Sequence, residues 1–202
     1  MKLASPQLIL ASNSPRRREL LRQAGYRFTV RAPPIEDRGL PAAPTPGALA
    51  ESLAYLKAAA AIDGYRLTAG LVLGADTIVV LGGRIIGKPA DEADARRILS
   101  DLSGSQHEVI TGLALVDAAS SRRMLAHDAT RIRMRRMSPA EIAAYVASGE
   151  ALGKAGAYAI QETGDRYVEE MAGSMTNVVG LPMQLLERML KAMGYEPGDF
   201  RD

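Results

Sequence analysis

Apolar residues along the chain fall into short continuous runs and into longer stretches with a repeating apolar face. The short runs and the strand-like stretches predict β-strands at residues 8–11, 26–32, 71–73, 78–81, 84–86, 108–116, 124–137 and 167–171. Helical spacing and Ala-rich composition predict helices at 15–24, 48–62, 91–102, 139–148 and 182–193. This loose alternation predicts an α/β fold in which helices pack against a mixed sheet.

Residues with special backbone preferences mark where these elements begin and end. Ser14 is a good helix N-cap in front of a proline, and Ser138 begins a capping box. The two glycines at 82–83 predict a two-residue hairpin. We expect the apolar run at 71–73 to end at residues 74–77. Residues 33–46 contain five prolines and are predicted to form a loop.

Composition and charge limit the classes of protein to which the chain can belong. Its 202 residues, 47% of them hydrophobic, suit a single domain over residues 1–202, either compact or in two lobes around one cleft. The net charge of +2 is too small to indicate a nucleic-acid-binding surface. The absence of cysteine excludes disulfides, zinc–thiolate sites, iron–sulfur clusters and thiol nucleophiles. The two histidines cannot build a His-rich metal site.

The sequence shows no targeting or membrane signal. The apolar run near the N-terminus has four residues, whereas a secretory signal needs about 7–15. No window reaches the roughly 18 apolar residues of a spanning helix. We therefore expect a cytoplasmic protein without a membrane partner.

Two basic segments are candidates for binding phosphate. Residues 82–89 nearly match the phosphate-loop pattern, but a proline stands where Ser or Thr should bind Mg²⁺, so an ATPase is disfavoured. Lys88 remains a candidate phosphate ligand in another geometry. Ser14, Arg16 and Arg17 lie at the start of a helix, where the N-terminus favours an anion. A bound polyphosphate and a solvated basic turn explain this cluster about equally well.

Candidate catalytic and metal-binding groups lie at three acidic positions. Asp76 follows an apolar strand, and strand ends line the ligand crevice of many α/β folds. A carboxylate buried there needs a metal, a cation or hydrogen bonds, although a turn aspartate is the alternative. Glu36 and Asp37 could add oxygen ligands for Mg²⁺, or form a solvent-facing acidic pair.

Lys154 and Gln161 lie at the two ends of a segment that contains a glycine. A cation and an amide in this segment could contact a nucleotide.

Arg131, Arg133 and Arg135 alternate with apolar residues, which is typical of a strand with one charged face. A solvated face explains such a pattern more often than nucleic-acid binding does. We interpret His107, which follows a loop-like stretch, as structural or as a support of the site. His127 is interpreted as a surface residue.

Several separated motifs together resemble the Maf family of nucleoside triphosphate pyrophosphatases, in family order and over residues 8–193. The motifs are LASNSPRR at 10–17, GADT at 74–77, GKP at 87–89, SG at 103–104, HEVITG at 107–112, YVASGE at 145–150, KAGAYAIQ at 154–161 and VGLP at 179–182. The resemblance implies an elongated mixed β-sheet with flanking helices and two lobes around a central cleft, the fold type of Maf and inosine triphosphate pyrophosphatases. It also implies hydrolysis of a nucleoside triphosphate to the monophosphate and pyrophosphate with a divalent cation, Mg²⁺ or Mn²⁺.

The family pattern implies roles for individual positions of this chain. Asp76 falls at the catalytic acidic position, as proton acceptor or metal ligand. Glu36 and Asp37 fall at the family's acidic pair, which usually ends in Glu, and complete the implied metal set. Basic positions around the triphosphate fall at Arg16, Arg17, Lys57 and Lys88, and positions linked to substrate choice at Arg17, Thr77 and Gln161. With Ser14 and Lys154 these residues form the predicted substrate-binding set.

The motifs also bear on which nucleotide is cleaved. Residues 75–77 and 157–161 resemble the dTTP/UTP branch of the family, whereas Asn177 resembles the branch that acts on 7-methyl-GTP. We predict hydrolysis of dTTP and UTP as house-cleaning of the nucleotide pool. The alternatives are a pyrophosphatase for 7-methyl-GTP or other modified nucleotides, and a non-enzymatic cell-division regulator or nucleic-acid-binding protein. The predicted partner is the nucleotide substrate, with no stable nucleic-acid partner; the sequence also allows a homodimer.

Overall fold

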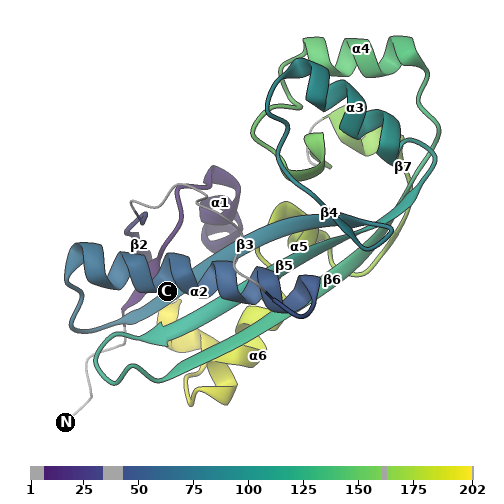
Figure 1. Cartoon of the computed structure of the whole chain (residues 1–202). Helices are drawn as coiled ribbons and strands as arrows, with labels where there is room; N and C mark the ends of the chain where they lie inside the picture. Colours follow the sequence, from purple (N-terminus) through teal and green to yellow (C-terminus); the bar gives the residue numbers. More distant parts are fainter. Residues whose placement is uncertain (1–6, 34–42, 161–162, 202) are drawn as a thin grey trace. The chain divides into compact units, whose positions relative to one another are not determined.

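The computed structural model describes residues 7–33, 43–160 and 163–201. Within these residues, seven strands form one mixed sheet in the order β2-β1-β3-β5-β6-β7, with β4 paired to β3 (Figure 1). Strand β1 is parallel to β2 and β3, whereas β4 and β7 are antiparallel to β3 and β6. The strands are β1 (Leu8–Leu10), β2 (Phe28–Val30), β3 (Leu71–Leu81), β4 (Arg84–Ile86), β5 (Gln106–Asp117), β6 (Arg123–Met134) and β7 (Val168–Ala172). The predicted mixed α/β sheet is therefore confirmed.

The helices begin and end close to the positions that the sequence predicts. They are α1 (Pro15–Gln23), α2 (Pro46–Tyr65), α3 (Glu92–Leu102), α4 (Pro139–Ala147), α5 (Met175–Val179) and α6 (Met183–Ala192). Ser14 caps α1, and Ser138 forms the expected capping box with Glu141 at the start of α4. Short α5 and three 3₁₀ turns, η1 (Ala155–Ala157), η2 (Thr163–Tyr167) and η3 (Pro197–Phe200), were not predicted.

The chain divides into two compact units. The first consists of Met1–Asp76, Thr111–Asp128 and Gly180–Asp202, and the second of Thr77–Ile110 and Ala129–Val179. The cleft that the resemblance implies stays a prediction.

Among the described residues, none of the helices has both the length and the apolar composition needed to span a bilayer.

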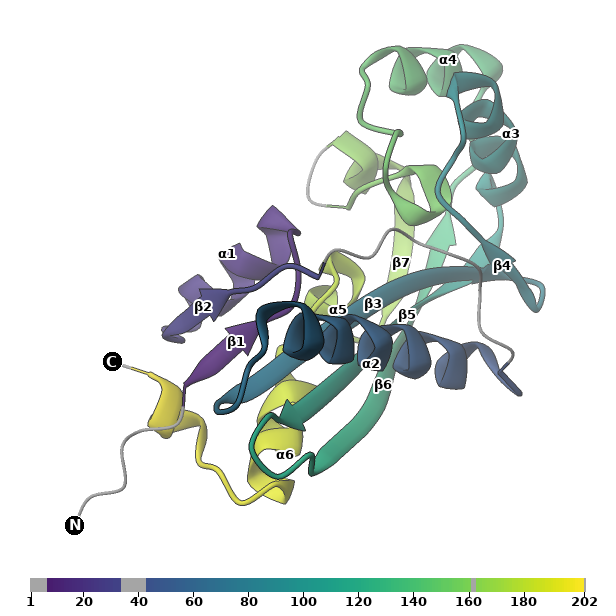
Figure 2. The same ribbon diagram turned by 60° about the vertical axis from the view of Figure 1, so that its left-hand side comes forward.

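In the first unit, helices cover both faces of the sheet. Helix α2 lies along one face, and α6 lies against the other (Figure 1, Figure 2). Alternation along the strands sends every second side chain toward α2. The resulting apolar cluster consists of Ile9, Ala11, Ala54, Ala58, Ala61, Val72, Ala114 and Val116. The opposite face of the strands meets the apolar stripe of α6, where Leu186 and Leu190 are fully buried.

Two glycines let α2 approach the sheet very closely. A Cβ atom added at Gly74 of β3 would lie 2.1 Å from the carbonyl oxygen of Ala54. A Cβ at Gly112 of β5 would lie 2.2 Å from the carbonyl carbon of Ala50. Any side chain at either position would therefore push the backbone of α2 away from the strands.

Strand β3 differs from the sequence-based prediction. Residues 74–77 do not end a strand, because β3 continues without a break from Leu71 to Leu81. Residues 71–73 pair with β1 and residues 79–81 pair with β4. The strand therefore has partners both before and after residues 74–77, where a turn was expected. Asp76 consequently lies in the middle of a strand and not at its end. The hairpin at Gly82 and Gly83 is confirmed, with φ of 55° and 79° at the two glycines.

The second unit is built around α3 and α4, which pack on each other, while α3 also packs on η1. Its core includes Ile98, Leu99 and Leu102 of α3, and Tyr145 and Val146 of α4. The segment after η1, at residues 158–160, has no regular helix or strand and is nonetheless buried.

Candidate active site

The turn between β1 and α1 is organised around the side chain of Arg17. Ser14 caps α1 because its hydroxyl accepts the backbone N–H of Arg17 at 3.4 Å. The guanidinium of Arg17 donates to Ser12 Oγ at 3.1 Å and to the backbone carbonyl of Gly180 at 2.8 Å. Arg17 is 9% exposed, so this charge is held in a fixed orientation between α1 and the segment leading into α6. Arg16, one residue earlier, is partly exposed.

Asp76 and Lys57 form an ion pair in the first unit. Asp76 lies two residues after Gly74, so strand alternation directs it to the α2 side of β3. Lys57 lies about one helical turn after Ala54, which contacts Gly74. The side chain of Lys57 is 20% exposed, and that of Asp76 is 12% exposed. Because an unpaired buried carboxylate is costly, the ammonium of Lys57 is what makes a charge at Asp76 tolerable there.

Because β1 and β3 are paired and parallel, the chain runs in the same direction from β1 into the α1 turn as it does from Leu73 to Asp76 in β3. The backbone N–H of Ala11 donates to the carbonyl of Leu73 at 2.8 Å. Ser14 follows Ala11 by three residues, and Asp76 follows Leu73 by three residues, in strands that run in the same direction. The first unit therefore collects one carboxylate and several cations of the predicted set, which is the composition that a metal–triphosphate substrate requires.

The second unit holds the other described members of the predicted set. Thr77 is half-buried and directly follows Asp76, so alternation directs its side chain to the other face of β3. Lys88 is exposed, and the carbonyl of Gly87 before it accepts the N–H of Gly156 at 3.1 Å. Lys154 precedes η1 and donates to the carbonyl of Glu150. The loop of Lys88 and the turn of Lys154 are thus joined.

Glu36, Asp37 and Gln161 lie outside the described residues, so their predicted roles stay predictions. Over residues 7–33, 43–160 and 163–201, no group of three or more His, Cys, Asp or Glu could hold a metal ion. Among the described members of the predicted set, Asp76 is the one that offers a hard carboxylate oxygen beside the cations. Mg²⁺ is commonly bound by one or two carboxylates together with substrate phosphates. The donor chemistry of Asp76 therefore fits a divalent cation that arrives with its nucleotide.

His107 and Tyr158 form a buried hydrogen-bonded pair in the second unit. Nε2 of His107 lies 2.8 Å from the phenolic oxygen of Tyr158, and the two rings meet edge to face. His107 is 1% exposed, and its Nδ1 has no partner among the described residues. Burial lowers the pKa of His107 to about 4 and raises the pKa of Tyr158 well above its ordinary value. Both side chains are therefore uncharged at neutral pH, in agreement with a structural role for His107.

Comparison with known proteins supplies the family. The model of the family described as Maf-like protein matches residues 7–193. The chain belongs to the Maf family. A relative from Pelotomaculum thermopropionicum is 46% identical over 94% of this chain and 97% of its own length. A relative from Gloeobacter violaceus is 50% identical over 91% of this chain and 94% of its own length. A relative from Symbiobacterium thermophilum is 45% identical over 94% of this chain and 95% of its own length. All three carry the name dTTP/UTP pyrophosphatase.

In this Maf-family chain, Asn177 is a buried residue of the fold. The sequence associates it with the 7-methyl-GTP branch, yet its side chain is 0% exposed. Its Nδ2 donates to the carbonyl of Val109 and to Thr130 Oγ1, both at 2.9 Å. Asn177 therefore ties α5 to β5 and β6. These contacts account for an asparagine at this position whichever nucleotide the enzyme prefers.

Sequence reasoning missed the contribution of Tyr145. Its hydroxyl accepts the backbone N–H of Ala159 at 3.1 Å, inside the motif at 154–161. The available signal was the apolar face of α4, where Tyr145 stands with Ile142 and Val146. A tyrosine on a buried helix face needs a hydrogen-bond partner for its hydroxyl, and a neighbouring irregular segment is a good source of one.

Proposed function

We propose that this Maf-family chain is a nucleoside triphosphate pyrophosphatase that converts dTTP and UTP to their monophosphates and pyrophosphate. The observation that carries the proposal is the Lys57–Asp76 pair, a buried carboxylate on the strand that pairs with β1, the strand leading into α1. It occurs in a chain that is 45–50% identical to relatives named dTTP/UTP pyrophosphatase over nearly its whole length. We infer a house-cleaning role that removes these nucleotides from the pool.

The chemistry follows from the charges of the substrate. Water attacks the α-phosphorus, the bond to the bridging oxygen breaks, and pyrophosphate leaves with the electron pair of that bond. In our proposal Asp76 orients this water and accepts its proton, as a general base does. Arg16, Lys88 and Lys154 neutralise the charge that builds up on the leaving pyrophosphate. Lys57 holds Asp76 in place, and Arg17, already fixed by Ser12 and Gly180, binds substrate in a set orientation.

A divalent cation belongs to the proposal. Asp76, with Glu36 and Asp37, would hold Mg²⁺ or Mn²⁺, which reduces the repulsion between the triphosphate and an attacking nucleophile when it is bound. Chelation should therefore abolish turnover, and added Mg²⁺ or Mn²⁺ should restore it.

The charged strand gives little support to the rival function of nucleic-acid binding. Arg133 pairs with Glu170 and Arg135 pairs with Glu141, both at 2.7 Å, so two of the three alternating arginines are matched by carboxylates. We accordingly propose no stable nucleic-acid partner. A gel-shift assay with DNA and RNA measures this directly, and light scattering measures whether the chain forms the homodimer that the sequence allows.

The test compares pyrophosphate release by the wild-type chain, Asp76→Asn and the control Asp63→Asn. Asp63 is an exposed aspartate near the end of α2, so its variant makes the same chemical change away from the pair. The panel contains dTTP, UTP, dCTP, dATP, dGTP and 7-methyl-GTP, each with Mg²⁺ and with Mn²⁺. We expect Asp76→Asn to lose about 10²–10⁴-fold in kcat, the usual contribution of a general base, with an unchanged circular-dichroism spectrum.

Two outcomes would contradict the assignment in different ways. Asp76→Asn activity within about three-fold of wild type would remove Asp76 from catalysis, because general bases contribute far more. A wild-type preference for 7-methyl-GTP would overturn the dTTP/UTP assignment and leave the pyrophosphatase assignment standing.

A further inference from the structure

Strand β6 has a partner strand on both sides along only part of its length. Strand β5 lies along one side of it, and β7 pairs with its residues 131–134 on the other side. Over Arg123–His127, the part of the chain that the structure describes places no strand on this second side. We call these residues the open edge of β6. They belong to the first unit.

The hydrogen bonds between β5 and β6 determine which backbone groups the open edge presents. In an antiparallel ladder, every second residue turns both its N–H and its C=O to the same neighbouring strand. The carbonyl of Arg122 accepts the N–H of Asp117 at 2.9 Å, and the N–H of Met134 donates to the carbonyl of Ser105 at 3.0 Å. The chain is equally long between these two bonds on both sides, so no residue is inserted. The even-numbered residues of β6 therefore bond towards β5, and the odd-numbered residues turn their backbone groups away from it.

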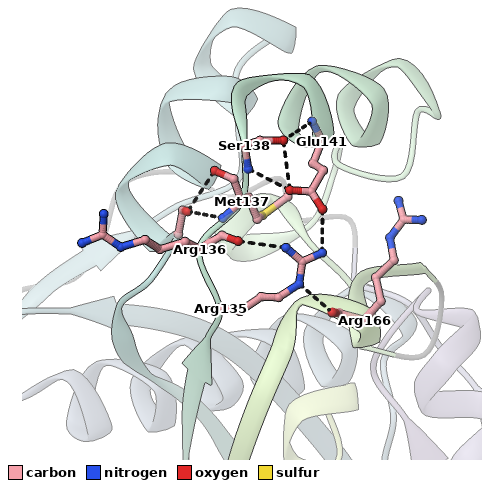
Figure 3. A network of polar contacts seen from close by, with 7 residues as sticks. Arg135, Arg136, Met137, Ser138, Glu141 and Arg166 are labelled. Atoms are coloured by element: carbon pink, nitrogen blue, oxygen red, sulfur yellow. Dashed lines mark hydrogen bonds and ion pairs between the residues drawn. The ribbon is translucent and has the colours of Figure 1, made fainter.

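The C-terminal end of β6 follows this pattern and is covered. The odd-numbered residues Arg131 and Arg133 lie opposite residues of β7. Directly after the strand, the guanidinium of Arg135 bonds the carboxylate of Glu141 at 2.7 Å and the carbonyl of Arg166 at 3.2 Å (Figure 3). A strand from another molecule therefore has no room to pair at this end, whereas the odd-numbered residues of the open edge present the same N–H and C=O groups without a partner strand.

The side chains of the open edge carry opposite charges at its two ends. The guanidinium of Arg123 lies over the ring of Tyr55 of α2, 5.1 Å from its centroid. At the other end, Nδ1 of His127 lies 2.7 Å from a carboxylate oxygen of Glu51, also on α2. Leu125 stands between them and is 38% exposed. An apolar centre is thus flanked by a cation on one side and by a carboxylate on the other.

We propose that the open edge is the interface of a homodimer, in which β6 pairs antiparallel with β6 of a second copy about a two-fold axis at Leu125. An interface on a two-fold axis must be complementary to itself, and this edge is. Leu125 lies opposite Leu125 of the second copy, and Arg123 lies opposite His127 of the second copy. All of these residues have outward backbone groups, so the pairing forms about six hydrogen bonds. Arg123 also comes close to Glu51 of the second copy, which gives two symmetric ion pairs.

The open edge lacks two devices with which natural proteins block the edges of sheets, proline and the β-bulge. It contains no proline, and the register shift of β6 lies further along, between Arg133 and Met134. Its two basic side chains are engaged by α2 and do not extend along the edge. At the opposite rim of the sheet, β2 has only three residues and so offers fewer backbone groups. A second copy therefore pairs better at β6 than at β2.

The first experiment reverses the charges that the two-fold axis brings together. Light scattering over a series of concentrations should show the wild-type chain approaching twice the 21.5 kDa of one chain. Arg123→Glu places two carboxylates beside each other across the interface, so we expect the dissociation constant of the dimer to rise about ten-fold or more. The double variant Arg123→Glu with Glu51→Arg should return to within about three-fold of the wild type, because the ion pair is restored with reversed signs. Arg188→Glu is the matched control, since Arg188 is an exposed arginine of α6 in the same unit.

Two results of this experiment would overturn the proposal. A wild-type mass of one chain at every concentration would show that no dimer forms. A dimer that Arg123→Glu weakens no more than Arg188→Glu does would show that the copies meet through another surface.

The second experiment removes one outward N–H. Leu125→Pro deletes the backbone donor at the axis and leaves the N–H groups that bond β5 in place, as proline on an edge strand does. Leu125→Ala shortens the side chain equally far from the fold's core and keeps this donor. We expect Leu125→Pro to be a monomer with a wild-type circular-dichroism spectrum, and Leu125→Ala to dimerise at least about ten-fold more tightly. Equal dimerisation of the two variants would exclude strand pairing. Should Leu125→Pro fail to fold, the charge variants decide the question without it.

The third experiment tests the position of the axis. The chain has no cysteine, so a single introduced thiol can cross-link only to the same residue of a second copy. Residues directly opposite in a hydrogen-bonded antiparallel pair have Cα atoms about 5.5 Å apart, which a disulfide spans. Under mild oxidation, Leu125→Cys should therefore form a covalent dimer at least about ten-fold faster than Leu56→Cys. Leu56 is a leucine of α2 that is 45% exposed and lies outside the open edge. Equal rates for the two variants would overturn the two-fold axis at Leu125.

Discussion

Acid should destabilise this protein well above the range in which its carboxylates titrate, because of one buried histidine. Burial lowers the pKa of His107 from 6.5 to about 4. At pH 5 the folded chain keeps this imidazole neutral, whereas the unfolded chain protonates it. The unfolded state then binds more protons, so the stability contribution is fully present above pH 6.5 and is lost as the pH falls from 6.5 towards 4.

The magnitude follows from the two pKa values. Linkage gives a loss of about 2 kcal/mol in the free energy of unfolding between pH 7 and pH 5, or about 30-fold in the folding equilibrium constant. His107 is 1% exposed, so solvent screening does not reduce this figure. Asp94, Asp117 and Glu141 have pKa values below their ordinary range and stay charged throughout the interval. The histidine effect is therefore separated from theirs.

Urea denaturation at pH 7 and pH 5, followed by circular dichroism, measures the effect. The wild-type chain and His107→Gln are compared with His127→Gln, which removes the other histidine, a side chain that is 42% exposed and bonded to Glu51. His107→Gln should lose about 2 kcal/mol of the acid sensitivity, and His127→Gln should keep it. If His107→Gln remained as sensitive to acid as the wild type, the buried neutral imidazole could not be its origin.

Two further predictions concern packing. Gly74→Ala should destabilise the chain by about 3 kcal/mol and lower pyrophosphate release, because its Cβ would meet the carbonyl oxygen of Ala54 and push α2 away; a melting temperature within about 2 °C of wild type would contradict this. Asn177→Ala should cost about 2–3 kcal/mol in urea denaturation, since it leaves the Val109 carbonyl and Thr130 short of a donor, with no change in the ranking of nucleotides; a switch toward 7-methyl-GTP would restore Asn177 as a specificity residue.

Local signals in the sequence located most of the helices and strands. The N-caps at Ser14 and Ser138 and the paired glycines at 82–83 each act through their own backbone geometry, so they are readable without knowing the fold. The apparent end of a strand at residues 74–77 was a misreading of Gly74. That glycine is required by the approach of α2 to β3 and not by a turn. In the sequence, a glycine required by the contact of β3 with α2 looks the same as a glycine required by a local bend. Only the packing distinguishes the two cases.

For the candidate site too, the sequence supplied some information and the structure was needed for the rest. The resemblance supplied Asp76, Lys57 and Arg17 as residues of one function, but it carried no statement about which of them meet. The structure pairs Lys57 with Asp76 and joins Arg17 to Gly180, 163 positions away. The role of Tyr145 was not accessible at all, because it depends on a backbone N–H of an irregular segment, and no residue type marks which backbone groups are left without a regular partner.

The position of the Lys57–Asp76 pair is a consequence of the same packing that buries the core. Alanines 54, 58 and 61 give α2 a smooth face, and the missing side chains at Gly74 and Gly112 let that face reach the strand backbones. At this separation between helix and strand, the ammonium group of Lys57 on α2 lies beside the carboxylate of Asp76, which follows Gly74 by two residues on β3. With a larger residue at Gly74 the ammonium would stand further from Asp76, whose buried charge would then be uncompensated. The small residues of α2 and β3 therefore belong to the chemistry of the site as much as the charged ones, because they set the distance between the two charges.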